Sequence, residues 1–128
     1  MSAAYAWAFM IAMPMAPVDD LERLVGEWRG DSTCVAKNTA CRDETVIYRI
    51  AKIPEKSGYL SVSADKIVNG NAVNMGTLEF RYDQDRDLLI CEYSQGRWQF
   101  KVDGRKMEGT LTRADNSVFR SVILRKEP

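Results

Sequence analysis

The sequence predicts an all-β domain, namely an eight-stranded antiparallel up-and-down (meander) barrel with a short helical turn at its N-terminal end. Three observations lead to this prediction. From residue 26 onward, short strand-like runs alternate with turn residues at regular intervals. The connections are too short for the crossover helices that parallel strands need. Several runs also alternate between apolar and polar residues, as expected for a sheet with one buried face.

Turn residues divide the chain into the predicted strands. The strand-like runs are 28–35, 45–50, 59–68, 75–82, 88–93, 98–102, 106–112 and 118–125. Asn69-Gly70 is a strong hairpin signal, because both residues tolerate the positive φ of a two-residue turn. The helical candidate is 18–25, which begins next to two aspartates that can cap it. Because short links pair successive strands antiparallel, these strands can close into a barrel without free edges.

Composition excludes several classes of function. A chain of 128 residues is one domain, and its 18 basic and 18 acidic residues give a net charge of zero. The basic residues are scattered, so no nucleic-acid partner is expected. The sequence has no histidine, which removes the usual general base and the usual haem and zinc ligand. Its three cysteines lack the Cys-x-x-Cys spacing of a zinc site.

The first 18 residues carry no charged side chain. The apolar run 3–15 is short for a membrane span and looks like the core of a secretory signal. No basic residue precedes the run, and Pro17 follows the candidate small-residue cleavage site, so a misassigned start or an apolar arm stays open. We expect 1–18 to be signal-derived and 19–128 to be the barrel domain of a periplasmic or secreted protein. No stable membrane span is expected in the mature form.

The cysteines also favour export. If the chain reverses at Lys37-Asn38, Cys34 and Cys41 lie opposite each other on facing strands, at a separation that a disulfide can bridge. Such a bond forms in an oxidising compartment, and two reduced cysteines in a hairpin are the alternative. Cys91 lies in an apolar run and is expected to be buried and free.

The residues at the two ends of the predicted barrel resemble a known pattern. Gly26 and Trp28 follow a short acidic segment and open the first strand, and Arg125 closes the last. With the meander of eight strands, this order of parts resembles the calycin superfamily, which includes lipocalins, fatty-acid-binding proteins and avidin-like barrels. The resemblance covers residues 19–126. It implies that Trp28 plugs one end of the barrel and that Arg125 stacks on its indole face.

Two narrower resemblances bear on function. The run Gly26-Glu27-Trp28-Arg29-Gly30 is similar to the opening of nitrobindin-type barrels, which bind haem through a histidine. This chain has no histidine, so no cofactor is expected. The scaffold and the apolar N-terminal segment also look like bacterial metalloprotease inhibitors, which insert an N-terminal arm into the protease cleft.

Aromatic residues on the middle strands are the candidate ligand-binding set. They are Tyr48, Phe80, Tyr82, Tyr93, Trp98 and Phe100. Their inward-facing members would line one chamber with apolar area and a few polar groups. A solidly packed core is the alternative, because a barrel of eight strands is just wide enough for either.

Acidic and hydroxyl residues give weaker signals. Asp83, Asp85 and Asp87 alternate in a turn, but the loop lacks the glycine and the distal glutamate of an EF-hand, so no metal is expected. Asp43 and Glu44 are adjacent and would point to opposite faces of a strand. We expect a non-enzymatic binder of a small, mostly apolar molecule. The alternative is a protein-interaction module, such as a secreted protease inhibitor with a filled barrel.

Thiol counting tests the expected cysteine pairing. Protein that is folded under oxidising conditions and then denatured without reductant should contain one free thiol, that of Cys91. Three free thiols in such material would contradict the Cys34–Cys41 bond.

Overall fold

The computed structural model of the chain describes residues 21–37 and 39–128. The expected signal-derived segment 1–18 lies outside the described residues, as does Asn38 of the expected chain reversal. Within the described part, the chain has no helix that is long and apolar enough to cross a membrane.

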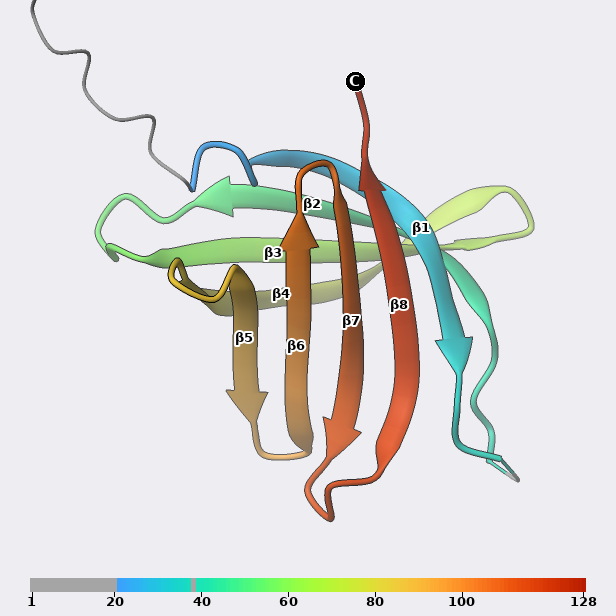
Figure 1. Cartoon of the computed structure of the whole chain (residues 1–128). Coiled ribbons are helices and arrows are strands. Elements are labelled where there is room, and N and C mark those ends of the chain that lie inside the picture. Colours follow the sequence, from blue (N-terminus) through green and yellow to red (C-terminus); the bar gives the residue numbers. More distant parts are fainter. Residues whose placement is uncertain (1–20, 38) are drawn as a thin grey trace, which may run out of the picture.

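Eight antiparallel strands form a closed barrel in which each strand pairs with its neighbours in sequence and β8 pairs with β1 (Figure 1). The strands are β1 (Gly26–Cys34), β2 (Glu44–Lys52), β3 (Tyr59–Val68), β4 (Asn71–Asp83), β5 (Leu88–Tyr93), β6 (Gly96–Asp103), β7 (Lys106–Arg113) and β8 (Val118–Lys126). This confirms the predicted all-β meander barrel. Of the expected helical turn at 18–25, the described part is a turn in which the Leu24 amide donates to the Leu21 carbonyl at 3.0 Å.

The largest difference from the expected boundaries is in β4, which begins at Asn71 instead of Met75. The reason is the tight turn at Asn69-Gly70, whose φ angles of 51° and 82° are both positive. This geometry suits a two-residue hairpin. Pairing therefore resumes at once, with Val68 opposite Asn71.

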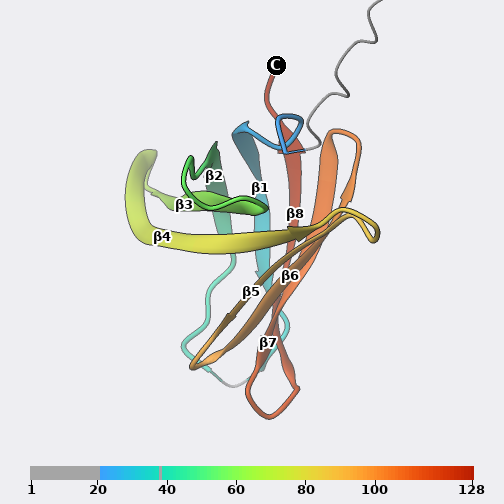
Figure 2. The same ribbon diagram turned by 90° about the vertical axis from the view of Figure 1, so that its left-hand side faces the viewer.

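The seam between β4 and β5 is closed over only part of its length. These strands pair only from Arg81–Ile90 to Asp83–Leu88, whereas β3 and β4 pair along ten positions. The part of β4 that precedes Arg81 has no strand partner on the side of β5. Figures 1 and 2 show β4 running across the molecule, in a direction different from that of β5 and β6. One half of the barrel is therefore closed all round, and the other half has a side opening.

The closed half is filled by large apolar side chains. The fully buried side chains of the core as a whole are Trp28, Phe100, Leu24, Leu60, Leu89, Met107, Leu124, Val46 and Val122. The Trp28 Nε1 donates to the Leu24 carbonyl at 2.9 Å, so the N-terminal turn covers this end of the barrel. A β-carbon at Gly109 would come within 2.3 Å of the Phe100 ring, so this glycine makes room for that ring.

Trp28 is fully buried at this end of the barrel, but the predicted stacking of Arg125 on its indole is wrong. Arg125 lies opposite Arg29 and is exposed, because it alternates with the buried Leu124. Lys126 lies opposite Trp28 instead, and its Nζ donates to the Arg23 carbonyl at 2.8 Å. The C-terminal cation at this end therefore holds the N-terminal turn in place.

Replacing Trp28 by alanine should lower the free energy of unfolding by about 3–5 kcal/mol, because it removes a fully buried aromatic side chain. The matched control is Arg125→Ala, which should change it by no more than about 0.5 kcal/mol for an exposed site. Chemical denaturation of both variants measures this. Equal effects of the two changes would contradict the assignment.

Candidate ligand-binding site

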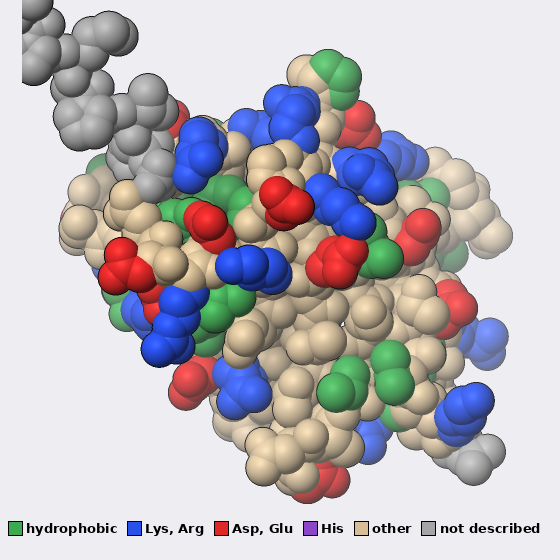
Figure 3. All heavy atoms as spheres, in the orientation of Figure 1, with side chains coloured by type: hydrophobic (Ala, Val, Ile, Leu, Met, Phe, Trp, Pro, Cys, Tyr) green, Lys and Arg blue, Asp and Glu red, His purple; other side chains and the backbone are tan. Residues whose placement is uncertain are grey.

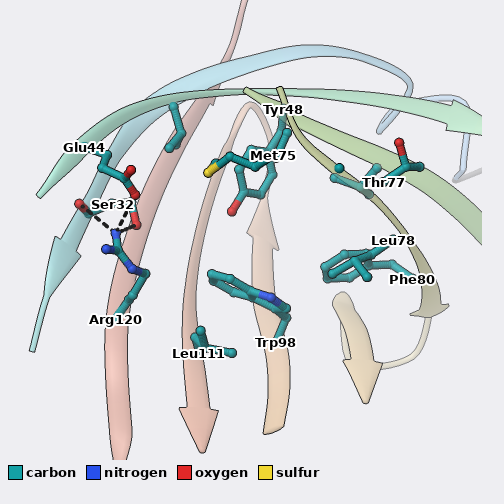
Figure 4. A pocket seen from close by; sticks show the side chains of 14 residues that line it. Ser32, Glu44, Tyr48, Met75, Thr77, Leu78, Phe80, Trp98, Leu111 and Arg120 are labelled. Carbon is teal, nitrogen blue, oxygen red and sulfur yellow. Dashed lines mark hydrogen bonds and ion pairs between the residues drawn. The ribbon is translucent and has the colours of Figure 1, made fainter. Parts of the chain in front are cut away.

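A cavity of about 300 Å³ occupies the open half of the barrel. Every strand except β5 contributes to its wall, and Figure 4 shows the side chains around it. The lining residues are Ser32, Glu44, Val46, Tyr48, Val62, Ala64, Met75, Gly76, Thr77, Leu78, Phe80, Trp98, Leu111 and Arg120. The barrel is thus packed in one half and hollow in the other, which combines the two alternatives left open by the sequence.

Half of the predicted aromatic set lines this cavity, namely Tyr48, Phe80 and Trp98. Phe100 lies directly beneath them and is buried. Its ring stacks on Trp98 with a centroid distance of 5.8 Å and an interplanar angle of 14°. It also meets Tyr48 edge-on at 5.7 Å. Phe100 therefore supports the cavity floor without lining it.

The other two predicted residues lie elsewhere. The Tyr82 hydroxyl donates to Asp87 Oδ1 at 2.5 Å, and its ring belongs to the packed core. Tyr93 is near the end of β5, where it borders a separate surface hollow with Arg113 and Phe119. Neither of them lines the cavity.

A polar group that the sequence analysis missed forms one corner of the cavity. Arg120 Nη1 donates to Ser32 Oγ at 2.5 Å and lies 3.2 Å from Glu44 Oε1. Arg120 and Glu44 are only 11% and 19% exposed, so this ion pair is largely shielded from water. Strand alternation could have indicated this group, because Ser32 lies four residues after Trp28 on the same strand and therefore faces the same side of the sheet. These residues were missed because they are far apart in sequence.

The disulfide borders the same corner. Cys34 and Cys41 are bonded, with 6.0 Å between their α-carbons, which confirms the predicted pair. Arg120 Nη2 lies 3.0 Å from Cys41 Sγ and donates to the Arg42 carbonyl at 2.7 Å. Cys91 is free and buried, also as predicted, and burial raises the pKa of its thiol. The guanidinium is therefore held by the loop that the disulfide closes.

Tyr48 supplies the polar group nearest the centre of the cavity. Figure 4 shows its hydroxyl directed into the space between Met75 and Trp98. Burial raises the pKa of Tyr48 well above its ordinary value; the positive charge of Arg120 opposes this effect and the negative charge of Glu44 adds to it. The phenol therefore stays protonated at neutral pH and can both donate and accept a hydrogen bond.

The mouth of the cavity is apolar. On the unpaired part of β4, Val73, Met75 and Leu78 are 42%, 45% and 38% exposed. The register shifts between Ala64 and Asp65, so Met75 is an extra residue on β4 and lines the opening. By contrast, Figure 3 shows charged side chains of both signs interspersed over the face in view. Among residues 21–37 and 39–128, no three Cys, Asp or Glu side chains gather to hold a metal ion.

Comparison with known proteins identifies the fold. No protein-family model matches the chain. No curated protein matches its sequence. Two solved structures are similar. Rv2717c from M. tuberculosis is 10% identical with a TM-score of 0.57, over 90% of this chain and all of that one. The siderocalin Ex-FABP, described as functioning through dual ligand specificities, is 13% identical with a TM-score of 0.59, over 83% of this chain and 74% of that one.

The fold is calycin-like. The closed meander of eight antiparallel strands and the likeness to a siderocalin agree on this point. At these identities the likeness concerns the fold alone, and the ligand has to be argued from the cavity itself.

The raised pKa of Tyr48 predicts a loss of stability in alkali. Above pH about 10, the unfolded chain releases the Tyr48 proton while the folded protein keeps it, so unfolding becomes easier as the pH rises. This residue alone should lower the free energy of unfolding by about 1.4 kcal/mol per pH unit there.

Denaturation of the wild type and Tyr48→Phe at a series of pH values isolates this contribution, because all other groups titrate in both proteins. The variant should lose stability less steeply above pH about 10. Identical slopes would mean that Tyr48 ionises freely in the folded protein.

Proposed function

We propose that this protein is a non-enzymatic binder of a small, mostly apolar molecule, which it holds in the open half of the barrel. The observation that carries the proposal is the cavity of about 300 Å³, lined by aromatic and aliphatic side chains with one polar corner. Small-molecule sites have this character, with a largely apolar wall and a few placed polar groups. The likeness to a siderocalin supports a ligand-binding role.

The size of the cavity limits both ligand and affinity. Its volume is at the lower end of the range of roughly 300–1,000 Å³ found for ligand sites. Micromolar binding needs about 8 kcal/mol, while apolar burial supplies about 25 cal/mol per Å² before the cost of association. A ligand must therefore be small and almost wholly enclosed to reach that affinity.

The polar corner does not resemble a catalytic site. The Ser32 hydroxyl accepts a hydrogen bond from Arg120. The guanidinium has no acceptor atom, so it cannot take the hydroxyl proton and activate Ser32 as a nucleophile. The sequence also lacks the histidine that usually serves as a general base. These features support binding without chemistry.

A protein-interaction role is the second candidate. The exposed Val73, Met75 and Leu78 on the free part of β4 favour it, because exposed apolar side chains that gather in one place are typical of contact surfaces. Met75 and Leu78 also line the cavity, however, where an apolar ligand would pass. The cavity therefore makes the small-molecule role the better supported one.

We also propose that the protein is exported. The Cys34–Cys41 disulfide is compatible with a periplasmic or extracellular location. The segment 1–18 has no charged residue, and we take it to be signal-derived and to precede a barrel domain at 19–128. This interpretation supports the same location.

Titration with the neutral dye N-phenyl-1-naphthylamine tests the proposal. We expect saturable fluorescence enhancement with a dissociation constant in the micromolar range, because the dye is apolar and small enough to be enclosed. Trp98→Ala should weaken binding about tenfold by removing an aromatic wall.

Two further variants make the test specific. Ala64→Phe should abolish binding by filling the cavity, and Tyr82→Phe should leave it unchanged, because Tyr82 does not line the cavity. Circular dichroism checks that each variant is folded. No saturable binding to the wild type would contradict the small-molecule role, and the interaction module would become the leading candidate.

A further inference from the structure

We propose that the cavity selects an uncharged, planar ring compound and rejects ligands that carry a carboxylate or another anionic group. The inference rests on the proposed binding function and names the chemical class of its ligand. Three features of the cavity support it: the contacts of the Arg120 guanidinium, the shape of the aromatic floor, and the position of the Tyr48 hydroxyl.

Both terminal nitrogens of the Arg120 guanidinium are already engaged by protein acceptors. Nη1 donates to Ser32 Oγ at 2.5 Å and pairs with Glu44 Oε1 at 3.2 Å. Nη2 donates to the Arg42 carbonyl at 2.7 Å and contacts Cys41 Sγ at 3.0 Å. An arginine that recognises a carboxylate presents two parallel N–H donors to it. Arg120 has no such pair left to offer.

The charge in the cavity wall is also balanced. Glu44 neutralises Arg120 inside the wall, and Lys66 Nζ approaches Glu44 Oε2 at 3.5 Å from the rim. The Lys66 side chain is 37% exposed, so water screens its charge. An entering anion would lose its hydration, meet the Glu44 carboxylate and find no free donor pair. Burying an unpaired charge in this way is strongly unfavourable.

The aromatic floor favours a flat ligand. One face of the Trp98 indole stacks on Phe100 at an interplanar angle of 14°, which leaves its other face to the cavity. The register places Trp98, Leu111 and Arg120 side by side along the wall, and Figure 4 shows Tyr48 and Met75 above them. The space is therefore a slot between an indole and the opposite wall. Ring stacking contributes about 0.5–1.5 kcal/mol beyond burial.

The Tyr48 hydroxyl supplies the polar contact for such a ligand. It points into the slot (Figure 4) and carries no charge at neutral pH. A phenol donates to a neutral carbonyl, ether or ring nitrogen and accepts from a neutral N–H or O–H group. One neutral polar group on a flat ring would satisfy it without disturbing the Arg120–Glu44 pair.

A matched pair of dyes tests the charge selection. N-phenyl-1-naphthylamine is neutral, and 1-anilinonaphthalene-8-sulfonate has the same ring skeleton with one added negative charge. We expect the wild type to bind the neutral dye at least about tenfold more tightly than the sulfonate. Glu44→Gln keeps the size of the side chain but leaves Arg120 without its counter-charge. This variant should shift the ratio of the two affinities about tenfold towards the sulfonate.

The control variant is Glu79→Gln, which makes the same chemical change in an ion pair on the exposed face, with Lys56 at 2.6 Å. It should leave both affinities unchanged. Equal or tighter binding of the sulfonate or of dodecanoate by the wild type would overturn the charge selection while leaving the binding function in place. A wild type that binds neither dye would instead contradict the binding function and this inference with it.

Discussion

The pairing of β8 with β1 closes the barrel, and Arg120 lies where this closure meets the cavity. From β8, its guanidinium reaches Ser32 on β1, Glu44 at the start of β2 and the carbonyl of Arg42 in the connection between them. One side chain therefore joins the last strand to the first two. The packing at this point is tight, since a β-carbon at Gly30 would come within 1.8 Å of the Ile123 carbonyl oxygen.

The short pairing of β4 with β5 sets the contrast between the two halves of the barrel. In the closed half, Trp28 and Phe100 fill the interior, and the N-terminal turn covers the end. In the other half, β4 parts from β5 after three paired positions, and the side chains that would otherwise meet across that seam are exposed. The cavity exists because the strands separate there, while the packed half supplies the hydrophobic stability of the fold.

The disulfide contributes to the site as well as to the chain connection. It joins the end of β1 to the segment before β2, which brings the Arg42 carbonyl and the sulfur of Cys41 against the Arg120 guanidinium. A buried charge is tolerated only where its hydrogen bonds and counter-charge are complete. The loop, Ser32 and Glu44 together meet that requirement. The cavity thereby gains a polar corner with a balanced charge.

Local pattern in the sequence predicted the strand order and the Cys34–Cys41 bond, because alternation and turn residues act between close neighbours. The burial of Trp28 was expected from the resemblance to calycin barrels. The sequence could not determine the register across the β8–β1 closure, and a shift of one residue moves a side chain to the other face of a sheet. Arg125 is therefore exposed although it was expected to stack on the Trp28 indole. The pairing of Arg120 with residues near the chain start likewise depends on closure. The cavity also depends on the tertiary structure, because it lies where β4 and β5 stop pairing.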